Sequence, residues 1–223
     1  SHLSVNNKVH LRYEILDQDD AAPTLELIEK GQIHLFSIMD HTPGQGQFSK
    51  LEHFTTYYSK AENLSASQAA SLAEERMAAR DAFDDSSIRD IAAACKANGV
   101  PMASHDDDTE EKVEYIHSLG VTISEFPVRM AADKAAKQRN MHVLMGAPNV
   151  LRGASLTQNL SGREAIAAGA CDMLGSDYSP MTLFHAVFAM QEAGLGELPE
   201  LFAMVTSNPA NALGLEDEIG QIK

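Results

Sequence analysis

Three segments of the sequence place ionisable side chains directly after short apolar runs. The segment 100–109 runs through Val-Pro-Met-Ala-Ser into a histidine and three aspartates, 33–41 ends on Asp-His, and 171–177 ends on Ser-Asp. Short apolar runs are typical of buried parallel strands, and the chemistry of α/β barrels lies just past the carboxyl ends of their strands. Imidazole and carboxylate groups bind divalent metals. We therefore expect these polar strand ends to converge on a metal ion.

Strands and helices must position these residues, and their sequence patterns alternate along the chain. Strands are predicted at 9–14, 33–39, 100–105, 121–126, 142–147 and 172–176. Helices are predicted at 23–30, 88–98, 109–119, 131–140, 161–168, 181–192 and 198–206, with a short one after Pro209. Such alternation implies right-handed crossovers and a parallel sheet, and polar residues at successive strand ends favour a barrel over an open sheet. A closed barrel of this type has eight strands, so the sequence predicts most of one.

Two segments depart from this alternation. Tyr57, Tyr58 and several Met, Ala and Glu residues recur at helical spacing within 49–83, which predicts a helical insertion over the strand ends. The segment 148–155 contains Pro and Gly, which favours an irregular connection that faces a ligand. We therefore expect a single domain over residues 1–223, with the insertion around 49–83.

The composition limits the classes of partner. Of the 223 residues, 44% are hydrophobic, which is enough for one globular domain with a substantial core. Lys and Arg total 17 against 32 Asp and Glu, a formal net charge of −15 that disfavours nucleic acid or an anionic membrane as a partner. An anionic small molecule would need a local cation or a bound metal.

The two cysteines indicate neither a disulfide framework nor a zinc site. Cys95 lies in a predicted helix and Cys171 just before a predicted strand, without paired spacing, so both are expected to be buried, reduced thiols. The sequence shows no secretory leader pattern and no apolar stretch near the length of about 18 residues that a membrane span needs. We expect a cytoplasmic protein.

Several multi-residue motifs occur in a fixed order. They are a strand ending in Glu14, one ending in His41, Ser-His-Asp-Asp at 104–107, Glu-Phe-Pro at 125–127, Met-Gly-Ala-Pro-Asn at 145–149, Arg-Gly-Ala-Ser at 152–155 and Ser-Asp-Tyr at 176–178. In this order they resemble the amidohydrolase superfamily and, within it, the diphosphatases of phosphonate metabolism that belong to the carbon–phosphorus lyase pathway. The resemblance covers about residues 10–215.

The resemblance implies an α/β fold of the TIM-like (β/α)8 type, a metal-dependent hydrolase barrel. In this superfamily the first barrel strand carries a histidine-centred metal motif, and a small β-sandwich is built from both ends of the chain. The first two barrel strands, that motif and the sandwich have no counterpart in the sequence. A partial barrel is therefore expected.

The resemblance also implies a site for one or two divalent ions, Zn, Mn, Fe or Mg. The implied metal ligands are Glu14, His41, His105, Asp177 and, where members of the superfamily commonly have a histidine, Glu125. Asp177 would hold the reactive water and act as general base. Asp106 and Asp107 would orient the ring of His105.

The residues expected to bind the substrate lie in two loops and one strand. They are Asn149, Arg152 and Ser155 in one loop, Gly44 and Gly46 in the other, and Arg12 in the strand. A guanidinium group and backbone amides suit phosphate oxygens, and glycines allow close backbone approach. Arg12 precedes Glu14 by two residues, so the two side chains share one face of their strand.

The implied reaction is hydrolysis of a phosphoanhydride in a ribose triphosphate phosphonate, with release of diphosphate. Near neutral pH it calls for a metal that lowers the pKa of water and offsets charge on phosphoryl oxygens. The same ligands suit a deacetylase or deaminase acting on a C–N bond, and a truncated, inactive barrel is a third alternative. The expected substrate is an anionic small molecule, with other phosphonate-pathway enzymes as functional partners. Open strand edges would favour homo-oligomers.

Each assignment also has a purely structural alternative. The aspartates 106–108 suit a solvated helix N-terminus, where the helix dipole stabilises negative charge. His41 lies where a turn begins, Glu14 suits a surface carboxylate, and Arg152 suits a surface ion pair. The metal content of the purified protein discriminates the truncated, inactive barrel from the hydrolase.

Overall fold

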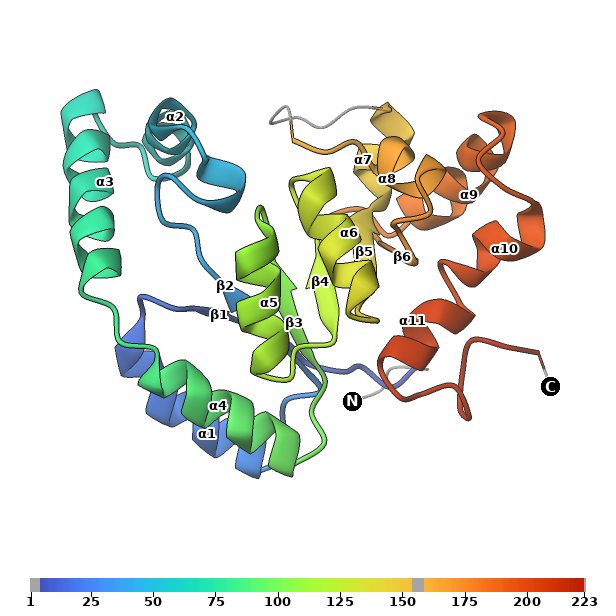
Figure 1. Cartoon of the computed structure of the whole chain (residues 1–223), viewed down its shortest axis with the longest axis horizontal. Helices are drawn as coiled ribbons and strands as arrows, with labels where there is room; N and C mark the ends of the chain where they lie inside the picture. Colours follow the sequence, from blue (N-terminus) through green and yellow to red (C-terminus); the bar gives the residue numbers. More distant parts are fainter. Residues whose placement is uncertain (1–4, 154–158, 223) are drawn as a thin grey trace.

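A six-stranded parallel sheet forms the centre of the computed structural model, which describes residues 5–153 and 159–222 (Figure 1). The strands are β1 (His10–Glu14), β2 (Leu35–Met39), β3 (Met102–His105), β4 (Ile123–Glu125), β5 (His142–Gly146) and β6 (Met173–Gly175). Their order in the sheet follows their order in the chain, and every neighbouring pair is parallel. The predicted parallel sheet of six strands is confirmed.

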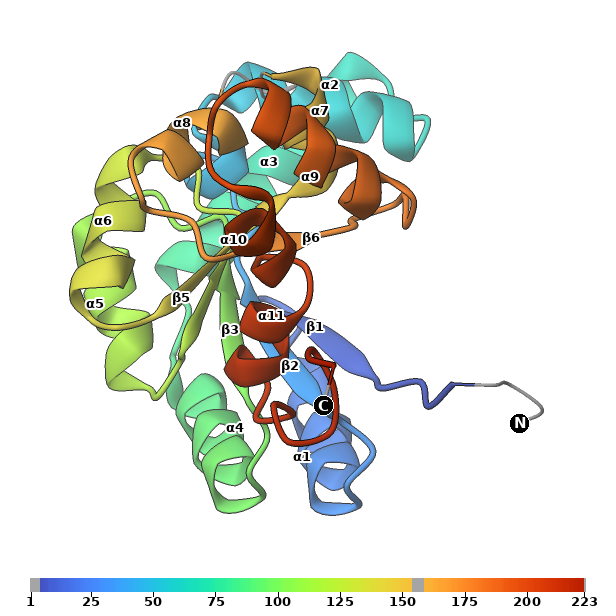
Figure 2. The same cartoon turned by 90° about the vertical axis from the view of Figure 1, so that its right-hand side faces the viewer.

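Helices connect the strands and cover the sheet (Figure 2). They are α1 (Ala21–Glu29), α2 (Leu51–Ala61), α3 (Ala66–Asp81), α4 (Ser86–Ala97), α5 (Glu110–Ser118), α6 (Met130–Gln138), α7 (Ala147–Arg152), α8 (Gly162–Ala167), α9 (Thr182–Glu192), α10 (Leu198–Ala203) and α11 (Ser207–Ala212). Helix α1 packs against α4, α5 against α6, and α7 against α9. This arrangement is that of repeated β-α units of a barrel wall.

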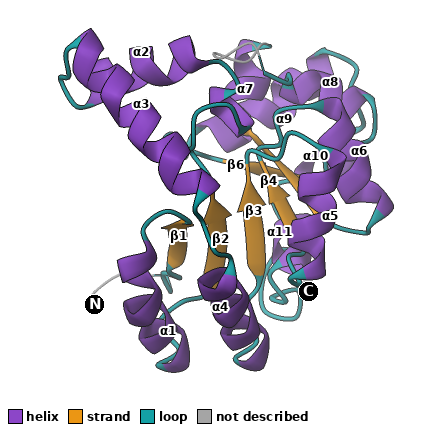
Figure 3. Ribbon diagram, turned by 60° about the vertical axis from the view of Figure 1, so that its left-hand side comes forward, coloured by secondary structure: helices purple, strands orange, loops and turns teal. Residues whose placement is uncertain are grey.

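The two outer strands of the sheet are β1 and β6, and they do not pair with each other within the described ranges. The wall therefore stays open on one side, as the sequence predicts for a partial barrel. The strands all point the same way, from the end of the molecule with α1 and α4 toward the end with α2, α3 and α7 (Figure 3). Residues that follow the strands are thereby brought to one end.

Residues with left-handed backbone follow several helices and redirect the chain toward the next strand. Gly99 and Gly120 have φ angles of 66° and 93° and directly follow the helical segments that precede β3 and β4. Asn140, with φ of 56°, takes the same position before β5. Glycine adopts this conformation without the steric cost of a Cβ, and asparagine tolerates it better than most residues.

The apolar core lies between the sheet and its covering helices in two main clusters. One contains Ile28, Phe36 and Val143, packed among α1, α4, α5, α6 and strands β1, β2, β3 and β5. The other contains Val150 and Met190, packed among α7 to α10 and the last two strands. Complete burial of an aliphatic or aromatic side chain stabilises a fold by about 1.5–3 kcal/mol, so these clusters hold the strand ends in place.

The segment 49–83 contains helices α2 and α3, which pack on each other beyond the strand ends (Figure 3). Phe48, Phe54 and Ala73 form its own small apolar cluster. Helix α3 begins at a capping box, in which Ser65 accepts from the backbone N–H of Gln68 and the Gln68 side chain accepts from the backbone N–H of Ser65. Such reciprocal bonds satisfy donors that a helix start leaves free.

The prediction of an irregular connection at 148–155 is wrong for its first part. Residues Ala147–Arg152 form helix α7, with Pro148 in the first turn and Gly153 in left-handed conformation at the end. Proline suits the first turn because its missing N–H would have no partner there, and glycine suits the end of a helix. The two residues that suggested a loop therefore delimit a short helix.

The two cysteines are free, as predicted. Burial raises the pKa of the Cys95 thiol to about 11, and burial also raises the pKa of the Cys171 thiol. Both groups are therefore neutral near pH 7. No helix within the described ranges is both long and apolar enough to cross a membrane.

Candidate metal centre

Two strand ends bring His41, His105 and Asp106 together. His41 follows β2, His105 ends β3, and Asp106 comes next in the chain. Nε2 of His41 lies 3.8 Å from Oδ2 of Asp106, and Nδ1 of His105 lies 3.0 Å from the same oxygen. One ligand atom from each of the three residues lies within 4.8 Å of the other two.

Two atoms of this group are buried without a hydrogen-bond partner in the described part of the chain. They are Nδ1 of His105 and Oδ2 of Asp106, which approach each other without the alignment of a hydrogen bond. Buried polar atoms without partners cost free energy, and a cation among them would satisfy both. Two imidazoles and a carboxylate are a donor set for Zn, Mn or Fe. These residues fit a divalent metal.

Glu14, which we expected as a metal ligand, lies behind His41 instead. Its Oε2 accepts from Nδ1 of His41 at 2.7 Å, and its Oε1 accepts from the backbone N–H of His41 at 3.0 Å. The register of the sheet explains this place, because Glu14 pairs with Met39 at the end of β2. A carboxylate on one imidazole nitrogen fixes the ring tautomer, so Nε2 of His41 keeps its lone pair toward Asp106.

The ring of His105 is held by two further neighbours. A terminal guanidinium nitrogen of Arg12 lies 3.2 Å from Nε2 of His105, and the ring of Phe126 meets the imidazole edge to face at 5.3 Å between centroids. Arg12 was expected to bind the substrate. The structure places its guanidinium group against the imidazole of His105.

An unusual backbone turns Asp106 toward the histidines. Its φ is 54°, which is uncommon for a residue with a Cβ and costs about 1 kcal/mol or more. The ammonium of Lys112 donates to the backbone carbonyls of His105 and Asp106 at 3.1 and 3.3 Å. The backbone N–H of Gly46 donates to Oδ2 of Asp108 at 2.9 Å. These contacts hold the strained segment from both sides.

Gly46, expected at the substrate, instead packs on this segment. A Cβ at Gly46 would lie 3.0 Å from the carbonyl oxygen of Asp106, and the φ of Gly46 is 51°. We expect Gly46→Ala to lower the free energy of unfolding by about 1–3 kcal/mol, measured by urea denaturation, and to weaken zinc binding measured by calorimetry.

Gly44→Ala is the matched control for this prediction. Gly44 also has positive φ, 92°, but a Cβ there would meet nothing within 4 Å. The variant carries only the backbone cost and should bind zinc as the wild type does. Equal zinc affinities of the Gly46→Ala variant and the wild type would contradict the role given to Gly46. Gly44 lines a separate cavity between α4 and α5, away from its expected place at the substrate.

Glu125, the other expected carboxylate ligand, stands apart from the three-residue group. Its Oε2 accepts from the hydroxyl of Ser37 at 3.1 Å and lies 4.0 Å from Nε2 of His10. Because the Ser37 proton goes to Glu125, the 2.6 Å contact between Ser37 and His10 is donated by His10. Burial lowers the pKa of His10.

Neither His10 nor Ser37 is among the residues that the sequence motifs indicate. His10, Arg12 and Glu14 alternate along β1, so their side chains share one face of the strand. This alternation was the sequence signal that could have placed His10 near the site. Ser37 gave no signal, since its partner Glu125 is 88 residues away in sequence.

Asp107 does not contact the ring of His105, which was its expected role. Its Oδ2 accepts from the hydroxyls of Ser104 and Ser124, both at 2.6 Å, and the side chain is fully buried. Its Oδ1 lies 3.7 Å from the ammonium of Lys112. Asp107 therefore fastens β3 to β4 on the face that carries α5 and α6.

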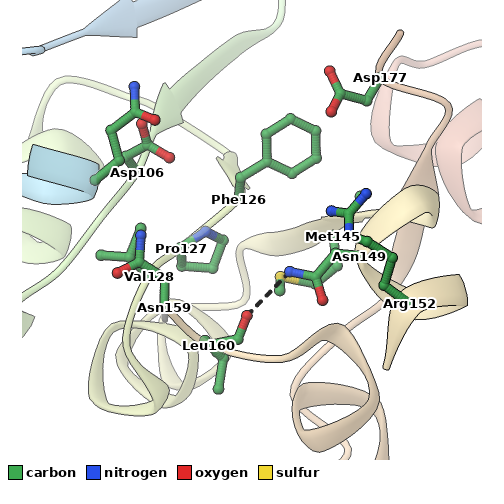
Figure 4. A pocket seen from close by; sticks show the side chains of 12 residues that line it. Asp106, Phe126, Pro127, Val128, Met145, Asn149, Arg152, Asn159, Leu160 and Asp177 are labelled. Carbon is green, nitrogen blue, oxygen red and sulfur yellow. Dashed lines mark hydrogen bonds between the residues drawn. The ribbon is translucent and has the colours of Figure 1, made fainter. Parts of the chain in front are cut away.

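A cavity of about 220 Å³ opens beside the three-residue group (Figure 4). Asp106 and Asp177 lie on its opposite sides, with Phe126 between them, and Arg152 lies near Asp177. Asp177 is exposed and, like Asp106, has left-handed backbone, with φ of 51°. Asp177 lies outside the group of His41, His105 and Asp106.

The residues expected to contact phosphate differ in whether their polar groups are still available to a ligand. Arg152 is exposed and donates to the hydroxyl of Tyr178 at 3.0 Å, so its guanidinium still has donors for a ligand. The amide of Asn149 is used within the protein, since it donates to the carbonyl of Leu160 and accepts from the N–H of Gly162. Ser155 lies outside the described residues.

Comparison with known proteins gives a family match. The model of the amidohydrolase family matches residues 38–223. Alpha-D-ribose 1-methylphosphonate 5-triphosphate diphosphatase of Escherichia coli (strain K12) is 38% identical over 214 residues, which are 95% of this chain and 56% of that enzyme. The chain thus spans a little over half the length of this relative.

Solved structures show weaker likeness. A prolidase complexed with N-methylphosphonate-L-proline aligns with 63% of this chain and 40% of its own, at 21% identity and a TM-score of 0.48. Guanine deaminase from C. acetobutylicum with bound guanine aligns with 93% of this chain and 65% of its own, at 13% identity and a TM-score of 0.40. On the match of the family model over residues 38–223, the chain belongs to the amidohydrolase family.

Proposed function

We propose that this chain carries the metal centre of a hydrolase that cleaves a phosphoanhydride. The observation that carries the proposal is the group of His41, His105 and Asp106, with two buried atoms that lack hydrogen bonds, at the edge of a cavity lined by Asp177 and Arg152. A bound divalent ion would lower the pKa of a water molecule and offset charge on phosphoryl oxygens.

Different residues of the chain hold the metal ion, orient its ligands and accept the proton. His41, His105 and Asp106 would hold the ion, and Glu14 keeps His41 in the tautomer that offers Nε2. Asp177, on the opposite side of the cavity, is the general base, because an exposed carboxylate there can take a proton from water in the cavity.

Arg152 supplies the positive charge that an anionic substrate requires. The formal net charge of the chain is −15, so a phosphate group that approaches the cavity needs a local cation. Arg152 lines the cavity and is exposed. A planar guanidinium can donate two hydrogen bonds to one phosphate, which orients the group as well as attracting it.

The substrate we propose is alpha-D-ribose 1-methylphosphonate 5-triphosphate, with diphosphate as a product. The 38% identity with the diphosphatase of E. coli supports this choice, and the exposed Arg152 suits a triphosphate better than a neutral amide. The net charge of −15 disfavours nucleic acid or an anionic membrane as the partner.

Diphosphate release from this substrate tests the proposal. We expect Arg152→Gln to raise KM about tenfold with a smaller change in kcat, since a charge-assisted contact to phosphate contributes to binding. Arg89→Gln is the control, because Arg89 of α4 pairs at the surface with Asp85, the residue before that helix. This variant should leave both constants unchanged. Absence of diphosphate release, together with hydrolysis of an N-acyl or amino substrate, would support a C–N hydrolase and overturn the proposal.

A further inference from the structure

We propose that Arg12 competes with the metal for His105, and that metal binding releases Arg12 to bind an anion. This inference rests on the proposed metal centre. Arg12 lies in β1, and a terminal guanidinium nitrogen is 3.2 Å from Nε2 of His105. A cation is therefore positioned against a side chain whose lone pair the metal needs.

The direction of this contact fixes the tautomer of His105. A guanidinium group has only donors and stays protonated in proteins, so Nε2 of His105 must accept. A neutral imidazole with an accepting Nε2 carries its proton on Nδ1. Nδ1 itself lies 3.0 Å from Oδ2 of Asp106, without the alignment of a hydrogen bond. In this state neither nitrogen of His105 offers a free lone pair.

Coordination through either nitrogen of His105 requires Arg12 to leave. If Nε2 is the ligand atom, the metal takes the lone pair that now accepts from Arg12. If Nδ1 is the ligand atom, the ring proton must move to Nε2, where an N–H would then oppose the N–H of Arg12. A metal cation near the guanidinium adds electrostatic repulsion in both cases. Arg12 must therefore be released whichever nitrogen of His105 binds the metal.

No carboxylate is paired with Arg12 in the described part of the chain, and Arg12 is exposed. Its guanidinium would then be free to pair with a phosphate group at the mouth of the site. Metal binding and anion binding are consequently coupled, and linkage makes the coupling reciprocal.

The first test measures zinc affinity by calorimetry, at fixed pH and without substrate. We expect Arg12→Gln to bind zinc about tenfold more tightly than the wild type, because a hydrogen bond from a charged donor no longer has to be broken. Arg129→Gln, which removes another exposed arginine outside the three-residue group, should leave the affinity unchanged. An Arg12→Gln affinity equal to or weaker than that of the wild type would overturn the inference.

The second test reads the tautomer of His105 by nitrogen-15 NMR in metal-free protein. We expect a protonated Nδ1 and an unprotonated Nε2 in the wild type, and loss of this preference in Arg12→Gln. A protonated Nε2 in the metal-free wild type would overturn the inference even if zinc binds. Failure of the wild type and every variant to bind zinc would contradict the proposed metal centre. The tautomer of His105 would still show whether Arg12 donates to Nε2.

Discussion

Replacement of Asp106 by asparagine is expected to weaken zinc binding by more than about a hundredfold and to remove hydrolase activity. The change keeps the shape of the side chain and suits the left-handed backbone, where φ is 54°, because asparagine tolerates that region as aspartate does. It removes the negative charge that lies between His41 and His105. Zinc calorimetry and diphosphate release on the same preparation measure the two effects.

Asp108→Asn is the control for this variant. Asp108 is two residues further along the chain and accepts from the backbone of Gly46, but it lies outside the group of His41, His105 and Asp106. The control removes the same formal charge from the same loop and should keep zinc affinity within about threefold. Similar losses in both variants would show that general charge, not coordination, explains the result.

The second large effect concerns Asp133, a fully buried carboxyl group in the first turn of α6. Neither of its oxygens has a hydrogen-bond partner in the described part of the chain. Burial, reinforced by the negative charge of Asp107, raises the pKa of Asp133 from 3.8 to about 8. The folded protein therefore keeps this carboxyl neutral near pH 7, whereas the unfolded chain ionises it.

Asp133→Asn should stabilise the protein above pH 4, by an amount that grows with pH. In the wild type the unfolded state releases a proton above pH 3.8 and the folded state does so only near pH 8, so stability falls across this window. The shift corresponds to a loss on the order of 4 kcal/mol between pH 4 and pH 7, which asparagine does not suffer. Urea denaturation in the presence of a chelator, from pH 4 to pH 8, measures the difference.

Asp90→Asn provides the reference for this experiment, because Asp90 is exposed on α4. Its stability should follow the pH dependence of the wild type. If the difference between Asp133→Asn and the wild type stayed constant from pH 4 to pH 8, the carboxyl would be ionised in the folded state. That result would contradict the raised pKa.

The strands and the sheet order were predictable from sequence for a physical reason. Buried parallel strands are short apolar runs between helices with clear ends, and left-handed residues such as Gly99 and Gly120 mark where helices stop. The carboxyl ends of adjacent parallel strands lie side by side, so the approach of His41 to His105 follows from the chain order alone. The short helix α7 was missed because Pro148 and Gly153 mark helix ends as well as loops.

The roles within the site were less predictable, because they depend on backbone direction and sheet register. Asp106 was expected to orient His105, and its Oδ2 lies 3.0 Å from Nδ1 of His105; its left-handed backbone also brings that oxygen within 3.8 Å of His41. Glu14 was expected in the group, but the pairing of β1 with β2 puts it behind His41. No sequence pattern indicated the burial of Asp133, since no pattern within one helix shows which side faces a neighbouring carboxylate.

Crystals grown with zinc, measured at wavelengths on both sides of the zinc absorption edge, test the central claim most directly. We predict an anomalous difference peak about 2.0–2.3 Å from Nε2 of His41, one ring nitrogen of His105 and one oxygen of Asp106. Glu14 should remain on Nδ1 of His41 without touching the ion. A peak bound elsewhere, or none at these three residues at saturating zinc, would contradict the account.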